Sequence, residues 1–214
     1  MKNSDKHKLV QNEYDRLADC YDIRWKFYID RSLEETISRI TRERIGGSCL
    51  DVGCGTGRFF QLLNKKYPDM KLNGVDISYP MIKKSKGNAR VLNSDAISLP
   101  YKPDSFDLVV SCSSFHHWRN IKDVLREIIR VLKPGGTFYL TDWCGNFLTS
   151  RILDVYFKKT NKAHNNVYTT KECKELLQTV GFKDIVSDVY KINWLWGLMT
   201  VSGTKRVRNG KNVH

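Results

Sequence analysis

Apolar and polar positions along the 214-residue chain alternate between two kinds of pattern. Short continuous apolar runs, typical of strands buried on both faces, are separated by stretches in which apolar residues return every three or four positions, as on one face of a helix. The predicted strands cover 48–52, 71–77, 89–95, 106–114 and 137–143, and the predicted helices between them cover 58–67, 80–87 and 121–132. This order predicts a parallel sheet with right-handed crossovers and helices on both faces.

Residues that favour helix ends mark the boundaries of two of these helices. Pro80 is suited to the first turn of helix 80–87, and Gly87 is suited to its end. Asn120 stands where it can cap the start of helix 121–132, and Pro134 follows its end.

The last fifty residues predict one more helix and two further strands. Lys171–Val180 has helical spacing, and Thr169 and Glu172 stand where they can form a capping box. Two strand-like runs follow at 183–190 and 197–203. Because their connection is short, we expect an antiparallel hairpin at the edge of the sheet.

The chain before the first strand predicts two helices. Apolar residues within His7–Tyr21 fall close to helical spacing. A second helix is predicted over Ser32–Arg44, whose Ser-Leu-Glu-Glu start is similar to a capping box.

Together these elements predict an α/β fold with a doubly wound, Rossmann-like, mostly parallel seven-stranded sheet, an antiparallel C-terminal hairpin and N-terminal helices. The length fits one domain over 1–214. We divide it into an N-terminal helical cap (1–47), a cofactor-binding core (48–145) and a substrate lid (146–168). Ligands of such sheets bind at the carboxyl ends of the strands.

The charge of the chain adds a nucleic-acid partner to the candidates. Lys and Arg number 36 against 23 Asp and Glu, which gives a net charge of +13. This excess attracts polyanions, but the basic residues are dispersed in groups near 39–44, 83–86 and 205–211. Dispersed charge is typical of a solvated surface, and a nucleic-acid role is therefore not favoured.

No targeting or metal motif is evident. The first ten residues lack the apolar core of a signal peptide, and the apolar run 192–201 is too short to span a bilayer, so we expect a cytoplasmic protein without a membrane span. The six cysteines include no CxxC pair, so no zinc or redox site is indicated, and buried free thiols are expected.

The stretch CLDVGCGTGRFF joins the first strand to the helix after it. A dinucleotide-binding loop needs G-x-G-x-x-G, but here Gly53 and Gly55 are followed by Arg58 at the third position, and Gly57 comes one residue early. Asp51 at the mouth of the loop would repel a pyrophosphate and suits a ligand with positive charge. S-adenosylmethionine, which has a sulfonium and an ammonium group, is such a ligand.

From Cys49 to Asp142 the chain resembles the class I S-adenosylmethionine-dependent methyltransferases, in particular the branch that includes the ubiquinone and menaquinone biosynthesis enzymes. The resemblance rests on LDVGCGTG, GVDIS, NSDAISLPY, FDLVVSCSSFHHW and LKPGGTFYLTD, which appear in the family's order. It is looser at the N-terminal YDRLADCYD and hardly extends beyond Asp142.

The resemblance implies roles for several acids. Asp76, about 20 residues after the glycine loop, accepts hydrogen bonds from both ribose hydroxyls. Asp95 accepts one from the adenine amino group, Ala96 lies beside the ring, and Asp51 faces the cofactor's ammonium. Further cofactor contacts are assigned to Gly53, Cys54, Gly55, Gly57, Ile77 and Ser111, and to Tyr14 and Tyr21. The two tyrosines fit an N-terminal lid and the core of a helix equally well.

The SFHHW segment ends the fourth strand, where the methyl acceptor is expected. His117, with His116 as the substitute, is the candidate general base, and both also fit a role as pocket walls. If the strand geometry persists to this point, the two side chains diverge and only one faces the methyl group.

The function that these observations favour is methyl transfer from S-adenosylmethionine to a small, partly apolar acceptor. The alternatives are a tRNA-directed methyltransferase and a basic module that binds the cofactor or RNA without catalysis. The segment 147–168 is expected to form an apolar wall over the acceptor or to pack against the N-terminal helices.

Overall fold

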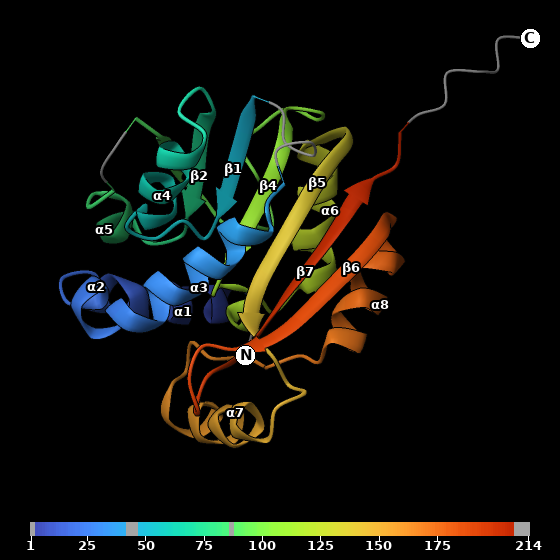
Figure 1. Cartoon of the computed structure of the whole chain (residues 1–214). Helices are drawn as coiled ribbons and strands as arrows, with labels where there is room; N and C mark the ends of the chain where they lie inside the picture. The colour runs from blue at the N-terminus through green and yellow to red at the C-terminus, as the bar shows by residue number, and fades with distance from the viewer. Residues whose placement is uncertain (1–2, 42–46, 86–87, 208–214) are drawn as a thin grey trace, which may run out of the picture.

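The computed structural model describes residues 3–41, 47–85 and 88–207. Within them the strands form a seven-stranded sheet in the order β3-β2-β1-β4-β5-β7-β6 (Figure 1). The strands are β1 (Ser48–Val52), β2 (Lys71–Asp76), β3 (Arg90–Asn93), β4 (Phe106–Cys112), β5 (Leu132–Trp143), β6 (Phe182–Lys191) and β7 (Gly197–Lys205). The strands β3, β2, β1, β4 and β5 pair in parallel, and β7 is antiparallel to both β5 and β6. This is the predicted doubly wound fold with a C-terminal hairpin.

The helices cover both faces of this sheet. They are α1 (Asn3–Leu17), α2 (Tyr21–Arg24), α3 (Lys26–Arg39), α4 (Arg58–Lys66), α5 (Tyr79–Ile82), α6 (Ile121–Val131), α7 (Leu148–Thr160) and α8 (Thr170–Val180), with a 3-10 turn η2 at Phe115–His117. Buried residues of α6 and α8 form one apolar core with one face of the sheet, and those of α3 and α4 form a second core with the other face. Alternate residues of a strand therefore enter different cores: Leu50 of β1 lies in the first and Cys49 in the second.

The carboxyl ends of the parallel strands meet at one edge of the sheet. The helices α1, α2 and α7 and the turn between β6 and β7 lie at this edge (Figure 1). The N-terminal helices are tied to it by hydrogen bonds, because the Thr36 hydroxyl donates to Thr141 of β5 (2.8 Å) and the Tyr28 and Ser113 hydroxyls are 2.8 Å apart.

The helix α8 has the capping box that the sequence predicts. The Thr169 hydroxyl accepts from the Glu172 backbone N–H, and the Glu172 carboxylate accepts from the backbone N–H of Thr169 at 2.7 Å. The capping box is complete, and α8 begins at Thr170, one residue before the predicted start.

The N-terminal helices differ from the prediction. Ser32 does not cap a helix; it lies within α3, is buried and donates its hydroxyl to Ile29 O. The helix begins six residues earlier because Tyr28, Ile29 and Leu33 share one apolar face that packs on the sheet. The predicted helix His7–Tyr21 is interrupted by a turn after Leu17.

Three further expectations need correction or lie outside the described residues. Asn120 precedes α6, but its side chain makes no capping hydrogen bond. Cys20 is exposed, unlike the other cysteines, which are buried or half-buried. Helix α5 ends at Ile82, and Gly87, predicted as its end, lies outside the described residues.

No helix within the described ranges is long and apolar enough to cross a membrane.

Candidate functional site

The glycine loop turns back directly after β1. The backbone N–H groups of Gly53 and Cys54 both donate to Val75 O, at 2.8 and 3.0 Å, which fixes the loop on the end of β2. Gly53 has φ +81°, and a Cβ there would lie 2.7 Å from the Cβ of Ser114. Only glycine fits both this conformation and the close approach of the β4 exit.

Asp51 is a buried acid with an unpartnered oxygen. Its side chain is 3% exposed, and its Oδ1 has no hydrogen-bond partner among the residues that the structure describes. Burial, and next the charge of Asp76, raise the pKa of Asp51 to about 8. A buried carboxyl in this state gains most from a cationic partner, because a positive charge compensates the lost solvation of its ionised form.

Asp76 at the end of β2 is held by the loop that it faces. Its Oδ2 accepts from the backbone N–H of Gly55 at 2.8 Å, and its Oδ1 accepts from that of Ser78 at 2.9 Å. Burial raises the pKa of Asp76, and these backbone hydrogen bonds oppose the shift. Because each carboxylate oxygen accepts more than one hydrogen bond, the fixed group can still receive hydroxyl donors.

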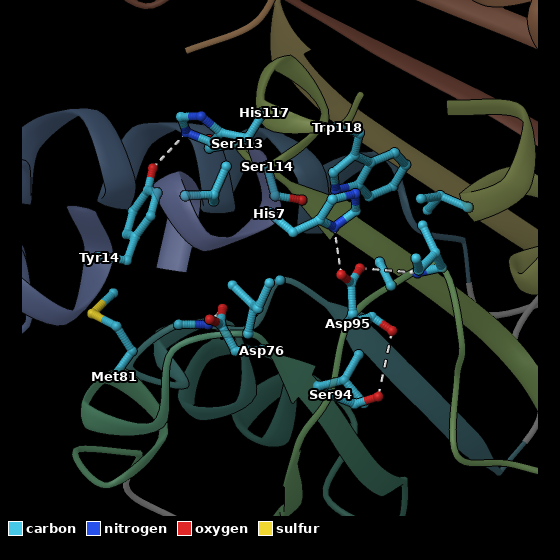
Figure 2. Close-up of a pocket in the computed structure, with 18 of the residues that line it drawn as sticks. His7, Tyr14, Asp76, Met81, Ser94, Asp95, Ser113, Ser114, His117 and Trp118 are labelled. Carbon is cyan, nitrogen blue, oxygen red and sulfur yellow. Dashed lines mark hydrogen bonds and ion pairs between the residues drawn. The ribbon is translucent and has the colours of Figure 1, made fainter. Parts of the chain in front are cut away.

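Asp95 after β3 contacts the N-terminal helix α1. His7 Nδ1 lies 2.5 Å from Asp95 Oδ2, and the backbone N–H of Ile97 donates to Oδ1 at 3.2 Å (Figure 2). The imidazole of His7 therefore contacts the carboxyl group to which the resemblance assigns an adenine amino group.

These groups surround two adjoining cavities at the carboxyl edge of the sheet. The larger one contains about 860 Å³ of empty space, including its open mouth, and Figure 2 shows its wall. The predicted site residues that line it are Tyr14, Tyr21, Gly53, Gly55, Asp76, Ile77, Asp95, Ala96 and His117. The smaller cavity shares Tyr21, Gly53 and Gly55 and adds Asp51 and Cys54.

Three of the predicted residues line neither cavity. Gly57 lies at the start of α4, with φ +75°. The buried Ser111 donates its hydroxyl to Val52 O at 2.8 Å, 2.6 Å from the Ser114 hydroxyl, so it supports the cavity wall from behind. The third residue is His116.

Helix α1 closes the larger cavity through contacts along its length. In addition to His7, the Tyr14 hydroxyl lies 2.6 Å from His117 Nε2, and the Ser78 hydroxyl donates to Asp15 Oδ1 at 2.6 Å. His7, Tyr14 and Tyr21 are spaced by seven residues, and all three line this cavity. The tyrosines were predicted and His7 was not, although a spacing of two helical turns puts His7 and Tyr14 on one face of α1.

His117 is a neutral imidazole with both nitrogens engaged. Its Nδ1 lies 2.9 Å from the carbonyl oxygen of Ala163, which can only accept, so Nδ1 carries the proton and Nε2 accepts from Tyr14. Burial, and next His116, lower the pKa of His117 well below its ordinary value. Burial raises the pKa of Tyr14, so the phenol keeps its proton.

His116 has a different environment. Its Nδ1 lies 2.7 Å from Asp142 Oδ1, its ring stacks on Trp143 at 4.7 Å, and it is buried. The condition under which the two histidine side chains were expected to diverge is not met, and their ring centroids are 3.9 Å apart. Strand β4 ends at Cys112, and Ser113, with φ +56°, leads into a 3-10 turn in place of extended backbone.

The segment 146–168 lies behind the histidines. It lines neither cavity, but Ala163 O holds His117, and His116 O accepts from the backbone N–H groups of Asn165 and Asn166. Leu153 and Phe157 of α7 pack against the apolar core that includes α3. The segment therefore positions the histidine turn and also contacts the core of the N-terminal helices.

Comparison with known proteins relates the middle of the chain to a family. Residues 50–140 match the family model of a methyltransferase domain. Over these residues the chain is similar to S-adenosylmethionine-dependent methyltransferases, the family that its sequence motifs resemble. The match spans β1 to β5, which carry Asp51, Asp76, Asp95 and the histidine turn.

Relatives of this chain differ in what their names say they act on. An uncharacterized protein of Methanocaldococcus jannaschii is 36% identical over 72% of this chain and 61% of its own length. A tRNA (carboxymethyluridine(34)-5-O)-methyltransferase of Arabidopsis thaliana is 38% identical over 46% of this chain and 24% of its own length, and a demethylmenaquinone methyltransferase of Thermus thermophilus is 29% identical over 57% and 55%. The chain thus spans less than two thirds of the length of each.

A solved structure shares the fold. A methyltransferase of Thermotoga maritima, described as a possible histamine N-methyltransferase, has a TM-score of 0.78 and 21% identity and covers 92% of this chain and all of its own. At this identity the likeness concerns the fold alone.

Proposed function

We propose that this methyltransferase binds S-adenosylmethionine across the two adjoining cavities and transfers its methyl group to a small, partly apolar acceptor that reaches His117. The observation that carries the proposal is the buried Oδ1 of Asp51, which has no hydrogen-bond partner within the described part of the chain. Asp51 lines the smaller cavity, which adjoins the larger one that Asp76 and Asp95 line.

The chemistry of these groups fits the cofactor. Asp51 meets the ammonium group, Asp76 accepts from the ribose hydroxyls, and Asp95 accepts from the adenine amino group. Gly53 and Gly55 line both cavities, and their backbone lets the cofactor approach without a side chain in the way. The cofactor supplies an electrophilic methyl group on a sulfonium, so displacement needs no covalent step by the protein.

The work of the protein in this mechanism is alignment and exclusion of water. Tyr14 and His117 close the cavity from α1 and from η2, and their hydrogen bond must open or rearrange for an acceptor to reach the methyl group. His117 Nε2 carries no proton, so it can accept one from an acceptor hydroxyl or ammonium. Because burial holds its pKa low, His117 is already a neutral imidazole throughout the neutral pH range.

The cofactor assignment predicts a loss of affinity when Asp76 is removed. Asp76→Ala should weaken the binding of S-adenosylmethionine and S-adenosylhomocysteine by ~1–3 kcal/mol, because charge-assisted hydrogen bonds to the ribose are lost. Isothermal calorimetry measures this change. The matched control is Asp123→Ala, an exposed aspartate on α6, which should bind like the unaltered protein. Equal affinity in Asp76→Ala, or tight binding of NAD, contradicts the proposal.

A tRNA acceptor is the second candidate, favoured by the relative that acts on tRNA and by the net charge of +13. Incubation of a cell extract with the protein and isotopically methyl-labelled cofactor distinguishes the two. Label in small molecules that survives prior nuclease treatment of the extract supports the small acceptor, and label that the treatment removes supports tRNA. Absence of turnover to S-adenosylhomocysteine, with cofactor binding intact, supports a non-catalytic module.

A further inference from the structure

Helix α7 has apolar side chains on the face that points to solvent. Leu148, Ile152, Val155 and Tyr156 are 73%, 60%, 56% and 57% exposed, respectively. Their spacing of three and four residues puts them on one face of the helix, which we call the outer face. The inner face is also largely apolar, with Leu153 and Phe157 packed on the core. A surface helix that is apolar on both faces marks an interaction site.

The charges around the outer face have one sign. Helix α7 contains Arg151, Lys158 and Lys159, and Lys159 continues the outer face one turn after Val155. Its acid, Asp154, is 14% exposed, lies 2.8 Å from His164 and pairs with Lys158 at 2.6 Å, so Asp154 is turned toward the protein and Lys158 is engaged by it. The outer face thus presents apolar and basic groups to solvent.

An exposed tryptophan lies in the turn next to α7. The turn between β6 and β7 lies beside α7 (Figure 1), since Ser150 donates to Gly197 O and Lys191 Nζ stands 5.3 Å from the centre of the Phe147 ring. Trp194 in this turn is 79% exposed. Tryptophan is enriched where proteins meet the headgroup region of a bilayer, because its ring is apolar and its N–H is polar.

We propose that the outer face of α7, with Trp194, docks the protein on an anionic lipid bilayer. Apolar side chains enter the boundary between headgroups and acyl chains, and Lys159, with the exposed Arg151, meets anionic headgroups. The basic border favours lipid over a protein partner, because protein interfaces are depleted in lysine. The inference is independent of the proposed methyl transfer. In this orientation the segment 146–168, in which Ala163 O accepts a hydrogen bond from His117, faces the membrane.

The test measures binding of the full-length chain to vesicles without any turnover. Sedimentation is carried out with vesicles of phosphatidylcholine containing about one third phosphatidylglycerol, and with phosphatidylcholine alone, at an ionic strength of about 0.15 M. We expect binding to the anionic vesicles that weakens with salt and is lower on neutral vesicles. The double variant Ile152→Glu/Val155→Glu should lose at least about tenfold in affinity, since two apolar contacts become repulsive charges.

Val186→Glu is the matched control. Val186 is 51% exposed on the edge strand β6, and its replacement should leave vesicle binding unchanged. All the replaced side chains are exposed, so the melting temperatures of the variants should stay close to that of the unaltered protein. The proposal is overturned if the unaltered protein does not bind anionic vesicles, or if the α7 variant binds them equally well. A dimer in light scattering that the α7 variant abolishes, without vesicle binding, would assign the outer face to a second copy of the chain.

Discussion

At the scale of single residues, the unusual feature of this site is a carboxyl group that the fold keeps protonated near neutral pH. Asp51 follows two apolar strand residues and is buried with them, so its ionised form lacks solvent. Among the residues that the structure describes, none forms a hydrogen bond with its Oδ1. The neighbouring Asp76 adds a like charge. Both effects favour the protonated form until a cation arrives.

This state predicts that cofactor binding releases a proton. At about pH 6.5 Asp51, with a pKa of about 8, is mostly protonated in the free protein, whereas an α-amino group, with a reference pKa of ~7.7–8.0, is mostly charged. Pairing with the ammonium group ionises Asp51, so the binding heat should depend on the ionisation enthalpy of the buffer. Calorimetry in several buffers measures this release. Asp51→Asn should bind more weakly and release no proton from this site.

The same pKa shift predicts how Asp51 affects stability. The pKa of Asp51 in the folded state is raised from 3.8 to about 8. Relative to higher pH, Asp51 therefore adds to the free energy of unfolding below about pH 4, and this contribution is lost as the pH rises through about 8. The melting temperature of Asp51→Asn should therefore rise relative to that of the unaltered protein as the pH increases from about 4 to 8. Buffer-independent binding heats together with parallel melting curves would show that Asp51 is already ionised in the free protein.

At the scale of elements, α1 decides whether the larger cavity is open. The helix contacts the ends of three strands through His7, Tyr14 and Asp15, which reach Asp95, His117 and Ser78. The His7–Asp95 pair is partly exposed, and exposed ion pairs are weak, at about 0–1 kcal/mol, whereas the contacts with His117 and Ser78 are single hydrogen bonds to buried groups. An element held in this way can separate from the sheet without unfolding the core.

We therefore predict that His7→Ala accelerates cofactor binding. The variant frees Asp95 Oδ2 for the adenine amino group and removes one contact that keeps α1 closed. Stopped-flow fluorescence of the tryptophans, of which Trp118 lines the cavity, should show an association rate increased severalfold. The melting temperature should hardly change, because the imidazole is 21% exposed and pairs with a side chain that is 30% exposed. An unchanged association rate would mean that His7 does not restrict entry.

At the scale of the whole molecule, the chain has a net charge of +13, and several of its lysines are paired with acids on the surface. Lys133 pairs with Asp107 at 2.8 Å, and Lys205, which the sequence groups with a basic tail, donates to Asp104 and to Leu132 O, both at 2.7 Å. Lys205 thus closes the end of β7 against the start of β5. The remaining basic excess attracts polyanions through long-range electrostatics.

This distribution predicts weak, salt-sensitive binding of bulk tRNA. Affinity should fall steeply between about 50 and 200 mM salt, since diffuse binding depends on released counterions. A chain truncated after Val207 keeps Lys205 but loses the basic residues that follow it. At the same salt concentration, it should bind tRNA more weakly than the full-length chain. Filter binding across a salt series measures both effects, and a salt-resistant, sequence-selective complex would favour the tRNA-directed alternative.

The local sequence by itself determined the order of elements, the sheet and the acids at the strand ends. Continuous apolar runs such as 106–112 specify strands buried on two faces, and a cap such as Thr169 with Glu172 lies within one helical turn. The loop glycines and Asp51 were recognisable because their chemistry depends on neighbours a few positions away. The likeness to a methyltransferase domain rests on the same stretch.

Only the tertiary structure decided which distant residues meet. The start of α3 at Lys26 and the burial of Ser32 follow from packing against the sheet. The sequence around Ser32, which is similar to a capping box, does not indicate this packing. The contacts of His7 with Asp95 and of His117 with Ala163 join segments 88 and 46 residues apart. Side-chain contacts at such separations depend on how the helices pack on the edge of the sheet. The apolar pattern of a single segment does not specify that packing.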